Sequence, residues 1–247
     1  FKAECKANTK RMYKDSQLNE ATNSWINLAN VHRYSYNFEW CGRPIIQYPQ
    51  DILAVQEIIW HVKPSLIIET GVAHGGSVIL HSSLLALLDL TEKIDRERSK
   101  RKVLAVDIDI RKHNHEALDN HPFKDYFELL ESSSIEDSTI KYIATEAKKF
   151  ETVLVILDSN HSHEHVLAEL EAYANLVSKG SYCVVFDTII EDLPANSFPD
   201  RPWDIGNNPQ SAVDSWMESR DDFIVDTSIS SKLQVTSNPG GYIKRIV

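Results

Sequence analysis

Residues 66–77 read LIIETGVAHGGS, and this stretch decides the fold of the 247-residue chain. It begins with apolar residues that favour a buried strand, and it then reaches an acid, Glu69. Three glycines form the turn that follows: Gly71, Gly75 and Gly76. The next segment, Ser77–Leu90, is apolar and long enough for about four helical turns. A strand, a glycine turn and a helix in this order open a doubly wound α/β domain, in which ligands lie beyond the carboxyl ends of the strands.

The spacing of the glycines indicates which ligand to expect. A dinucleotide-binding turn needs G-x-G-x-x-G, whereas this chain has Ala73 two residues after Gly71. The pattern E-x-G-x-x-x-G-G-S, from Glu69 to Ser77, resembles the turn of S-adenosylmethionine (SAM) methyltransferases. A tight turn without a ligand is the alternative interpretation, because glycines also permit positive φ after any buried strand.

Composition limits the possible partners. The net charge of −10 argues against nucleic acid, which needs a basic surface. No apolar run reaches the roughly 20 residues of a membrane span. Three widely separated cysteines indicate neither a disulfide framework nor a zinc site, and Cys183 is expected in the core. We therefore expect a cytoplasmic protein with a small-molecule or glycan partner, although a leader before Phe1 could have been trimmed.

The periodicity of the chain predicts an α/β fold with a doubly wound, mostly parallel sheet. We divide the chain into an N-terminal helical and loop extension, 1–48, and a methyltransferase domain, 49–247. After the first strand, further strands are expected at Val103–Val106, Tyr126–Leu130, Val153–Leu157, Tyr182–Phe186, Phe223–Val225 and Tyr242–Ile246. After the first helix, others are expected at Glu136–Phe150, His163–Val177 and Pro209–Ser219, and one at Asp51–Val62 precedes the first strand.

Three segments lie outside this regular pattern. Residues 1–33 predict one or two helices that either cap the sheet or form a contact in a homo-oligomer. Residues 34–49 are rich in aromatic residues and are predicted to be a packed loop, with substrate contact as the less common alternative. Thr188–Asn208 contains three prolines and is predicted to be a loop that covers the acceptor, because structureless loops of this length are usually functional or disordered.

Four predicted strands end in an acid, and those ends meet at one edge of a parallel sheet. The acids are Glu69, Asp107, Asp158 and Asp187. A single acid at such a position often only caps the next helix, but four together indicate a polar site.

Each cofactor group has a candidate partner at this edge. A carboxylate at the end of the second strand suits a ribose diol, so Asp107 is the candidate, although NAD would use the same geometry. Glu69 could hold the ammonium group of SAM, directly or through water. Ser133 and Ser134 follow the third strand, where they either bind the adenine edge or cap the next helix.

Methylation of an alcohol needs a base or a metal that lowers the pKa of the hydroxyl. Asp158 and Asp187 suit a hard cation such as Mg²⁺. His161 is our candidate base, since its ordinary pKa is near neutral and its neighbours are polar, although most histidines near a helix start are solvated or cap the helix. His163 and His165 are two residues apart, which is the wrong spacing for a shared metal on one helix face.

Several motifs together resemble the cephalosporin hydroxylase and rhamnosyl O-methyltransferase family of class I SAM methyltransferases, over residues 40–245. They are WCGRPIIQ at 40–47, IIETG with GGS at 67–77, VDIDIR at 106–111, LDSNH with EHVLAEL at 157–170, DT at 187–188 and NPGGY at 238–242. The resemblance implies SAM at the first turn and at Asp107. It also implies a magnesium-type site at Asp158 and the fifth strand, and an acceptor hydroxyl on a sugar or natural product.

The chain departs from the usual family pattern at two positions. Phe186 stands where the family usually has Glu, and Asn160 stands where it usually has Asp. We therefore expect a loose metal site, with neutral oxygens available from Asn160 and Thr188. Two alternatives to an O-methyltransferase remain: a non-catalytic SAM-binding scaffold, motivated by Phe186, and an NAD-type oxidoreductase or epimerase.

Overall fold

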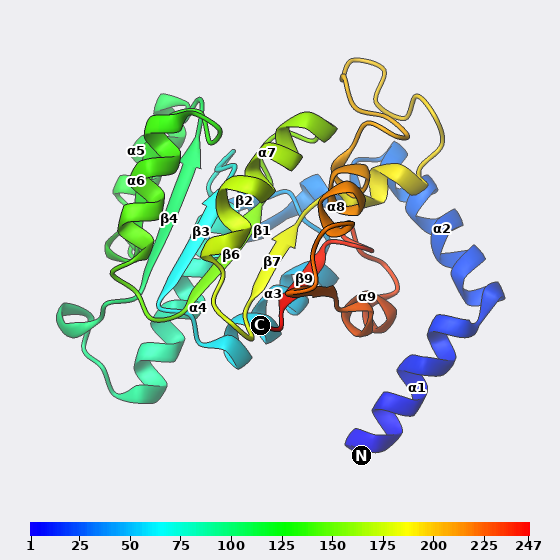
Figure 1. The fold of residues 1–247 in the computed structure, drawn as a ribbon, viewed down its shortest axis with the longest axis horizontal. Helices are drawn as coiled ribbons and strands as arrows, with labels where there is room; N and C mark the ends of the chain where they lie inside the picture. The colour runs from blue at the N-terminus through cyan, green and yellow to red at the C-terminus, as the bar shows by residue number, and fades with distance from the viewer.

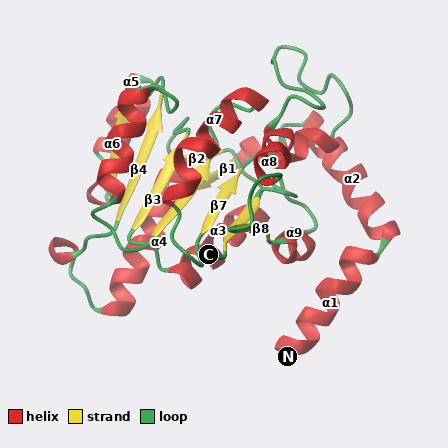
Figure 2. Ribbon diagram, viewed as in Figure 1, coloured by secondary structure: helices red, strands yellow, loops and turns green.

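A seven-stranded sheet forms the centre of the computed structural model, which describes residues 1–247. The strand order is β5-β4-β3-β6-β7-β9-β8. The first five strands in this order are parallel, and β9 runs antiparallel to both β7 and β8. Helices lie on both faces of the sheet (Figures 1 and 2). The predicted doubly wound α/β fold is therefore confirmed.

The elements have the following bounds. The strands are β1 Phe38–Trp40, β2 Arg43–Ile45, β3 Leu66–Thr70, β4 Lys102–Asp107, β5 Phe127–Glu131, β6 Val153–Leu157, β7 Tyr182–Val185, β8 Phe223–Val225 and β9 Tyr242–Arg245. The helices are α1 Lys2–Lys14, α2 Ser16–Val31, α3 Pro49–Val62, α4 Gly76–Glu92, α5 Lys112–Asp119, α6 Asp137–Ala147, α7 His163–Tyr173, α8 Pro209–Met217 and α9 Thr227–Leu233. Short 3₁₀ helices are η1 Tyr34–Asn37, η2 Arg96–Arg98, η3 Lys124–Tyr126, η4 Ala174–Leu176 and η5 Thr188–Asp192.

The two faces of the sheet bury two separate apolar clusters. Successive side chains of a strand point to opposite faces, so Ile67 joins the cluster under α3 and α4 whereas Leu66 and Ile68 join the one under α6, α7 and α8. Strand β3 lies between β4 and β6, with Leu66 opposite Lys102 and Val153. The turn after β3 therefore lies at the middle of the sheet edge.

The N-terminal helices lie beside the sheet rather than in its layers (Figure 1). Helix α1 has no buried residue, and α2 buries only Ile26. An aromatic cluster fastens α2 to the body: Trp25 packs edge-on against Tyr34, whose ring stacks on that of Tyr48. The expected helices in 1–33 are confirmed.

Five predicted boundaries or segments need correction. Residues 34–49 are not all loop, because they contain the β1–β2 hairpin. Thr188–Asn208 is not wholly irregular, since it begins with η5. Helix α9 was not predicted, and α6 and α7 end before the predicted limits. None of the helices combines the length and apolar character needed to cross a membrane.

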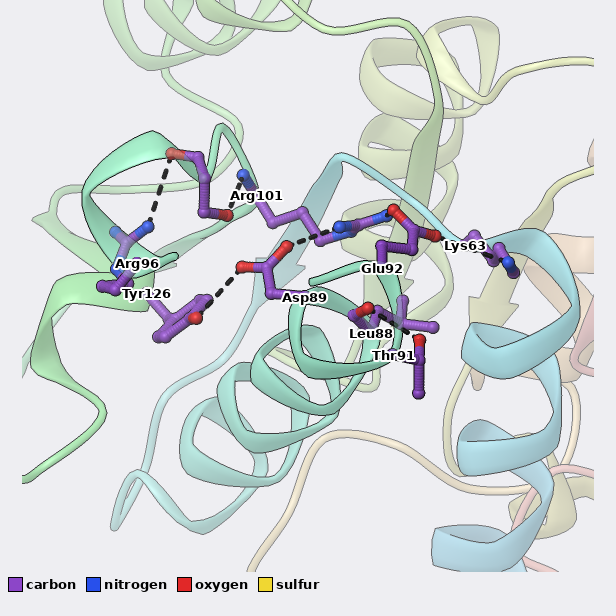
Figure 3. A network of polar contacts seen from close by, with 9 residues as sticks. Lys63, Leu88, Asp89, Thr91, Glu92, Arg96, Arg101 and Tyr126 are labelled. Carbon is purple, nitrogen blue, oxygen red and sulfur yellow. Dashed lines mark hydrogen bonds and ion pairs between the residues drawn. The ribbon is translucent and has the colours of Figure 1, made fainter. Parts of the chain in front are cut away.

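A buried ion-pair network fixes the end of α4 at the edge of the sheet remote from the glycine turn (Figure 3). Asp89 accepts hydrogen bonds from the Arg101 guanidinium at 2.5 Å and the Tyr126 hydroxyl at 3.0 Å. Arg101 also donates to Glu92 at 2.8 Å. The charged segment after α4 therefore includes a structural arginine that holds α4 against β4 and β5.

Candidate active site at the carboxyl edge of the sheet

Close packing requires glycine at two positions of the turn after β3. Gly71 has φ +90°, and a Cβ atom there would lie 2.0 Å from the carbonyl oxygen of Asp158. A Cβ atom at Gly76 would lie 2.2 Å from the carbonyl oxygen of Pro44. Gly75 has φ +81° and precedes the first residue of α4. The turn is therefore pressed between the β2 segment and the end of β6.

Asp107 ties the end of β4 to this turn. Its Oδ2 accepts hydrogen bonds from the backbone N–H groups of Val72 at 2.7 Å and Ala73 at 3.1 Å. Its Oδ1 accepts one from Asp109 N at 3.2 Å. A carboxylate offers about four lone-pair sites, so the half-buried Asp107 retains capacity for a ligand hydroxyl.

Two residues that the sequence interpretation missed hold the outer side of the turn. Arg43 donates to the carbonyl of His74 through Nε at 3.0 Å and Nη2 at 2.6 Å. Arg43 also donates to Asn114 Oδ1 at 2.8 Å, and Asn114 Nδ2 donates to the carbonyl of Ala73 at 2.9 Å. These bonds satisfy turn carbonyls that a helix or sheet ladder would otherwise satisfy.

The structure buries Glu69 rather than placing it at the open edge of the sheet. Its side chain is 1% exposed and lies beneath α4, where it accepts a hydrogen bond from Ser77 Oγ and lies 2.6 Å from His81 Nδ1. Ser77 lines a small cavity together with Gly71, Gln47 and Asp158, but Glu69 does not. Glu69 is therefore linked to the cavity only through the hydroxyl of Ser77.

The two predicted serines lie at the end of β5, but neither caps the next helix. The N-cap of α6 is Glu136, and it has no side-chain cap bond, so the capping alternative is wrong. Ser134 is buried and its Oγ lies 3.2 Å from His165 Nε2. Ser133 has no comparable side-chain bond to the protein, so its hydroxyl remains available.

Three predicted catalytic and metal-binding residues form one cluster at the ends of β6 and β7. One ligand atom from each of Asp158, His161 and Asp187 lies within 4.8 Å of the others. His161 Nε2 is 3.3 Å from Asp187 Oδ2. Burial raises the pKa of Asp158 well above its usual value, and the charges of Asp187 and Glu69 raise it further. Two carboxylates and an imidazole, crowded with negative charge, are a donor set that fits a divalent cation.

The two departures from the family pattern have structural explanations. Phe186 is 2% exposed and packs in the apolar cluster of α3 and α4, so it offers no ligand atom. Asn160 Oδ1 accepts bonds from Ser162 N at 2.9 Å and Ser162 Oγ at 2.8 Å. Thr188 Oγ1 is buried and accepts from Gly240 N at 3.3 Å. The neutral oxygens expected from Asn160 and Thr188 are therefore already used.

A buried hydrogen-bond network, which the sequence interpretation missed, holds the backbone of Asp187. Asp187 has φ +56°, a strained conformation for a residue with a side chain, and its N–H donates to Asn238 Oδ1 at 3.1 Å. Asn238 Oδ1 also accepts from Ser237 Oγ at 2.8 Å. Ser237 in turn donates to the fully buried Asp51 from its backbone N–H at 2.8 Å.

The long loop before α8 reaches the cluster. The ring of Trp203 lies edge-on to that of His161, with centroids 4.8 Å apart. The Arg201 guanidinium lies 5.2 Å from the centre of the Trp203 ring. The start of α7 contacts the same loop, because the His163 N–H donates to Asn207 Oδ1 at 3.0 Å.

The sequence of the chain matches a known protein family. The family model described as rhamnosyl O-methyltransferase/CmcI matches residues 32–246. The chain belongs to this family. Relatives named rhamnosyl O-methyltransferase occur in Mycobacterium tuberculosis H37Rv, 31% identical over 198 residues, and in Mycobacterium leprae, 28% identical over 212 residues. The match to the M. tuberculosis relative covers 79% of this chain and 73% of that protein. The match to the M. leprae relative covers 83% of this chain and 82% of that protein.

Solved structures show the same fold at lower sequence identity. The magnesium–SAM structure of CmcI has a TM-score of 0.58 at 17% identity and covers 86% of this chain and 78% of its own. CalS11, a TDP-rhamnose 3′-O-methyltransferase of calicheamicin biosynthesis, has a TM-score of 0.53 at 16% identity and covers 98% and 93%. This member of the family therefore has the class I methyltransferase fold, as predicted.

Proposed function

We propose that the chain transfers a methyl group from SAM to a hydroxyl of a sugar or small natural product, and that a divalent cation held by Asp158 and Asp187 assists. One observation carries this proposal. The glycine turn and the acid cluster share a wall, because the α-carbon of Gly71 packs directly against the carbonyl of Asp158. A cofactor seated on the turn thus lies beside the cluster that activates the acceptor.

The relatives named rhamnosyl O-methyltransferase support a rhamnosyl group as the acceptor. The residues at the edge of the sheet support the cofactor, since Asp107 retains hydrogen-bonding capacity for a ribose hydroxyl and Gly71, Gly76 and Ser77 line the small cavity where the amino-acid tail would lie. Ser133 is available for the adenine edge. SAM supplies a methyl group on a sulfonium, which an oxygen nucleophile attacks in line.

The residues of the cluster perform the acid–base chemistry. His161 accepts the proton of the acceptor hydroxyl, and Asp187, 3.3 Å from His161 Nε2, stabilises the imidazolium that results. A cation at Asp158 and Asp187 would lower the pKa of the same hydroxyl and would relieve the repulsion that raises the pKa of Asp158. Trp203 covers His161 and limits the access of water to the reacting atoms.

The test is formation of S-adenosylhomocysteine (SAH) from SAM with rhamnosylated acceptors and nucleotide-linked rhamnose, measured before and after chelation and with added Mg²⁺. We expect turnover that the chelator lowers and Mg²⁺ restores. Turnover that is insensitive to chelator but is lost in His161→Ala would refute the metal assignment. Tight SAH binding without turnover of any acceptor would favour the non-catalytic scaffold, and binding of NAD in place of SAH would favour the oxidoreductase.

A further inference from the structure

Residues 44–47 form a wall of the small cavity beside the glycine turn. The β1–β2 hairpin lays Arg43 along the glycine turn, and the carbonyl of Pro44 touches Gly76. Gln47, just beyond β2, lines the small cavity of about 40 Å³ together with Gly71, Ser77 and Asp158. The segment therefore faces the cofactor turn from the side opposite β4.

The amide oxygen of Gln47 lacks a hydrogen-bond partner. The side chain is only 3% exposed and lines the cavity beside Asp158. The amide oxygen, Oε1, is buried and has no donor. A buried acceptor without a donor costs free energy, so this oxygen indicates a missing partner.

No protein donor reaches this oxygen, and several polar groups near the cavity already have partners. The Arg43 guanidinium is bonded to His74 and Asn114, and the Ser77 hydroxyl is bonded to Glu69. The backbone N–H groups of the turn at residues 72 and 73 are bonded to Asp107. The donor must therefore come from a bound molecule. Because the nearby carboxylate of Asp158 makes the surroundings negative, a cationic donor fits best.

We infer that Gln47 is a cofactor-binding residue whose Oε1 accepts a hydrogen bond from the ammonium group in the amino-acid tail of SAM. An ammonium group carries three donors, so it can bond to Gln47 and to a neighbouring carboxylate at the same time. This inference rests on the proposed function, since it assigns a contact within the same cofactor site.

The test compares two variants and two ligands by calorimetry. Gln47→Met keeps a side chain of similar length and removes the acceptor. Gln50→Met is the matched control, because Gln50 Oε1 is also buried without a donor but lies outside the cavity. The ligands are SAH and 5′-methylthioadenosine, which lacks the amino-acid tail.

We expect Gln47→Met to bind SAH about 10- to 100-fold more weakly, the usual effect of losing a hydrogen bond to a charged group. Its affinity for 5′-methylthioadenosine should change less than about threefold, and Gln50→Met should match the parent for both ligands. Thermal unfolding without ligand should show Gln47→Met to be no less stable than the parent, because an unpaired acceptor has been removed.

Two results would overturn the inference while leaving the proposed function intact. The first is parental SAH affinity in Gln47→Met, and the second is equal weakening of both ligands, which would mean a general distortion of the cavity. Failure of the parent protein to bind SAH at all would instead overturn the proposed function together with the inference.

Discussion

Replacing Asp51 with Asn should change how the stability of the protein depends on pH. Asp51 is fully buried in α3 and accepts hydrogen bonds from Thr236 Oγ1, from Ser237 N at 2.8 Å and Oγ at 3.0 Å, and from Tyr242 OH at 2.8 Å. Burial is the main cause that raises the pKa of Asp51 from 3.8 to about 6, and the hydrogen bonds lower it in part.

The sign of the effect follows from the raised pKa. Between about pH 4 and pH 6 the folded state keeps a proton that the unfolded state has lost. The stability that this proton provides is therefore complete below pH 3.8 and is lost as pH rises through about 6. The shift corresponds to about 3 kcal/mol in total, of which about 2 kcal/mol falls between about pH 4.5 and 7.5. Asn does not titrate, so the variant lacks this loss.

The assay is urea denaturation followed by tryptophan fluorescence at several pH values across that range. The free energy of unfolding of the parent should fall by about 2 kcal/mol relative to Asp51→Asn as pH rises. Tyr242→Phe should steepen the dependence, because the Tyr242 hydrogen bond lowers the pKa of Asp51. A difference between parent and Asp51→Asn that stays constant from pH 4.5 to 7.5 would refute the reasoning.

Four other changes test the site. Gly71→Ala should abolish SAH binding, because its Cβ would overlap the Asp158 carbonyl. Gly180→Ala is the control, since Gly180 also has a positive φ, +83°, but has open space around it. This control should lose only about 1 kcal/mol of stability, from backbone strain, when measured by thermal denaturation. Asp107→Ala should weaken SAH binding at least tenfold in calorimetry, and parental affinity would exclude it from the site. Trp203→Ala should raise the KM for the acceptor and leave the affinity for SAH unchanged. Equal weakening of acceptor binding and SAH binding would show instead that the loop before α8 has only a structural role. Asp187→Asn should shift the Mg²⁺ dependence of turnover to higher concentration, and an unchanged Mg²⁺ titration would contradict its role as a ligand.

The sheet could be predicted in detail because its strands are apolar runs with clear boundaries. Val153–Leu157 and Phe223–Val225 match β6 and β8 to the residue. The β1–β2 hairpin escaped prediction because its two-residue turn is Cys41-Gly42, with φ +47° and +81°. Such a turn favours Asn or Asp before Gly, so cysteine gave no signal.

The site was predicted in part, and the misses have physical causes. The position of Asp158 and Asp187 at the ends of strands correctly predicted that they lie together. That position does not show toward which face of the sheet a side chain points. Glu69 is two residues after Ile67, so the alternation of a strand places both under α4. Arg43 and Asn114 meet across 71 residues of sequence, a pairing that no local pattern contains.

The position of β9 between β7 and β8 has a consequence for the order of folding. The five parallel strands lie within residues 66–185, so on a ribosome they emerge and can pair before residues 238–245 exist. Asn238, which holds the backbone of Asp187, belongs to that late segment. A chain stalled before it would have most of its sheet and its glycine turn, yet Asp187 would lack its support. Assembly of the acid cluster is therefore a late event in the synthesis of the chain.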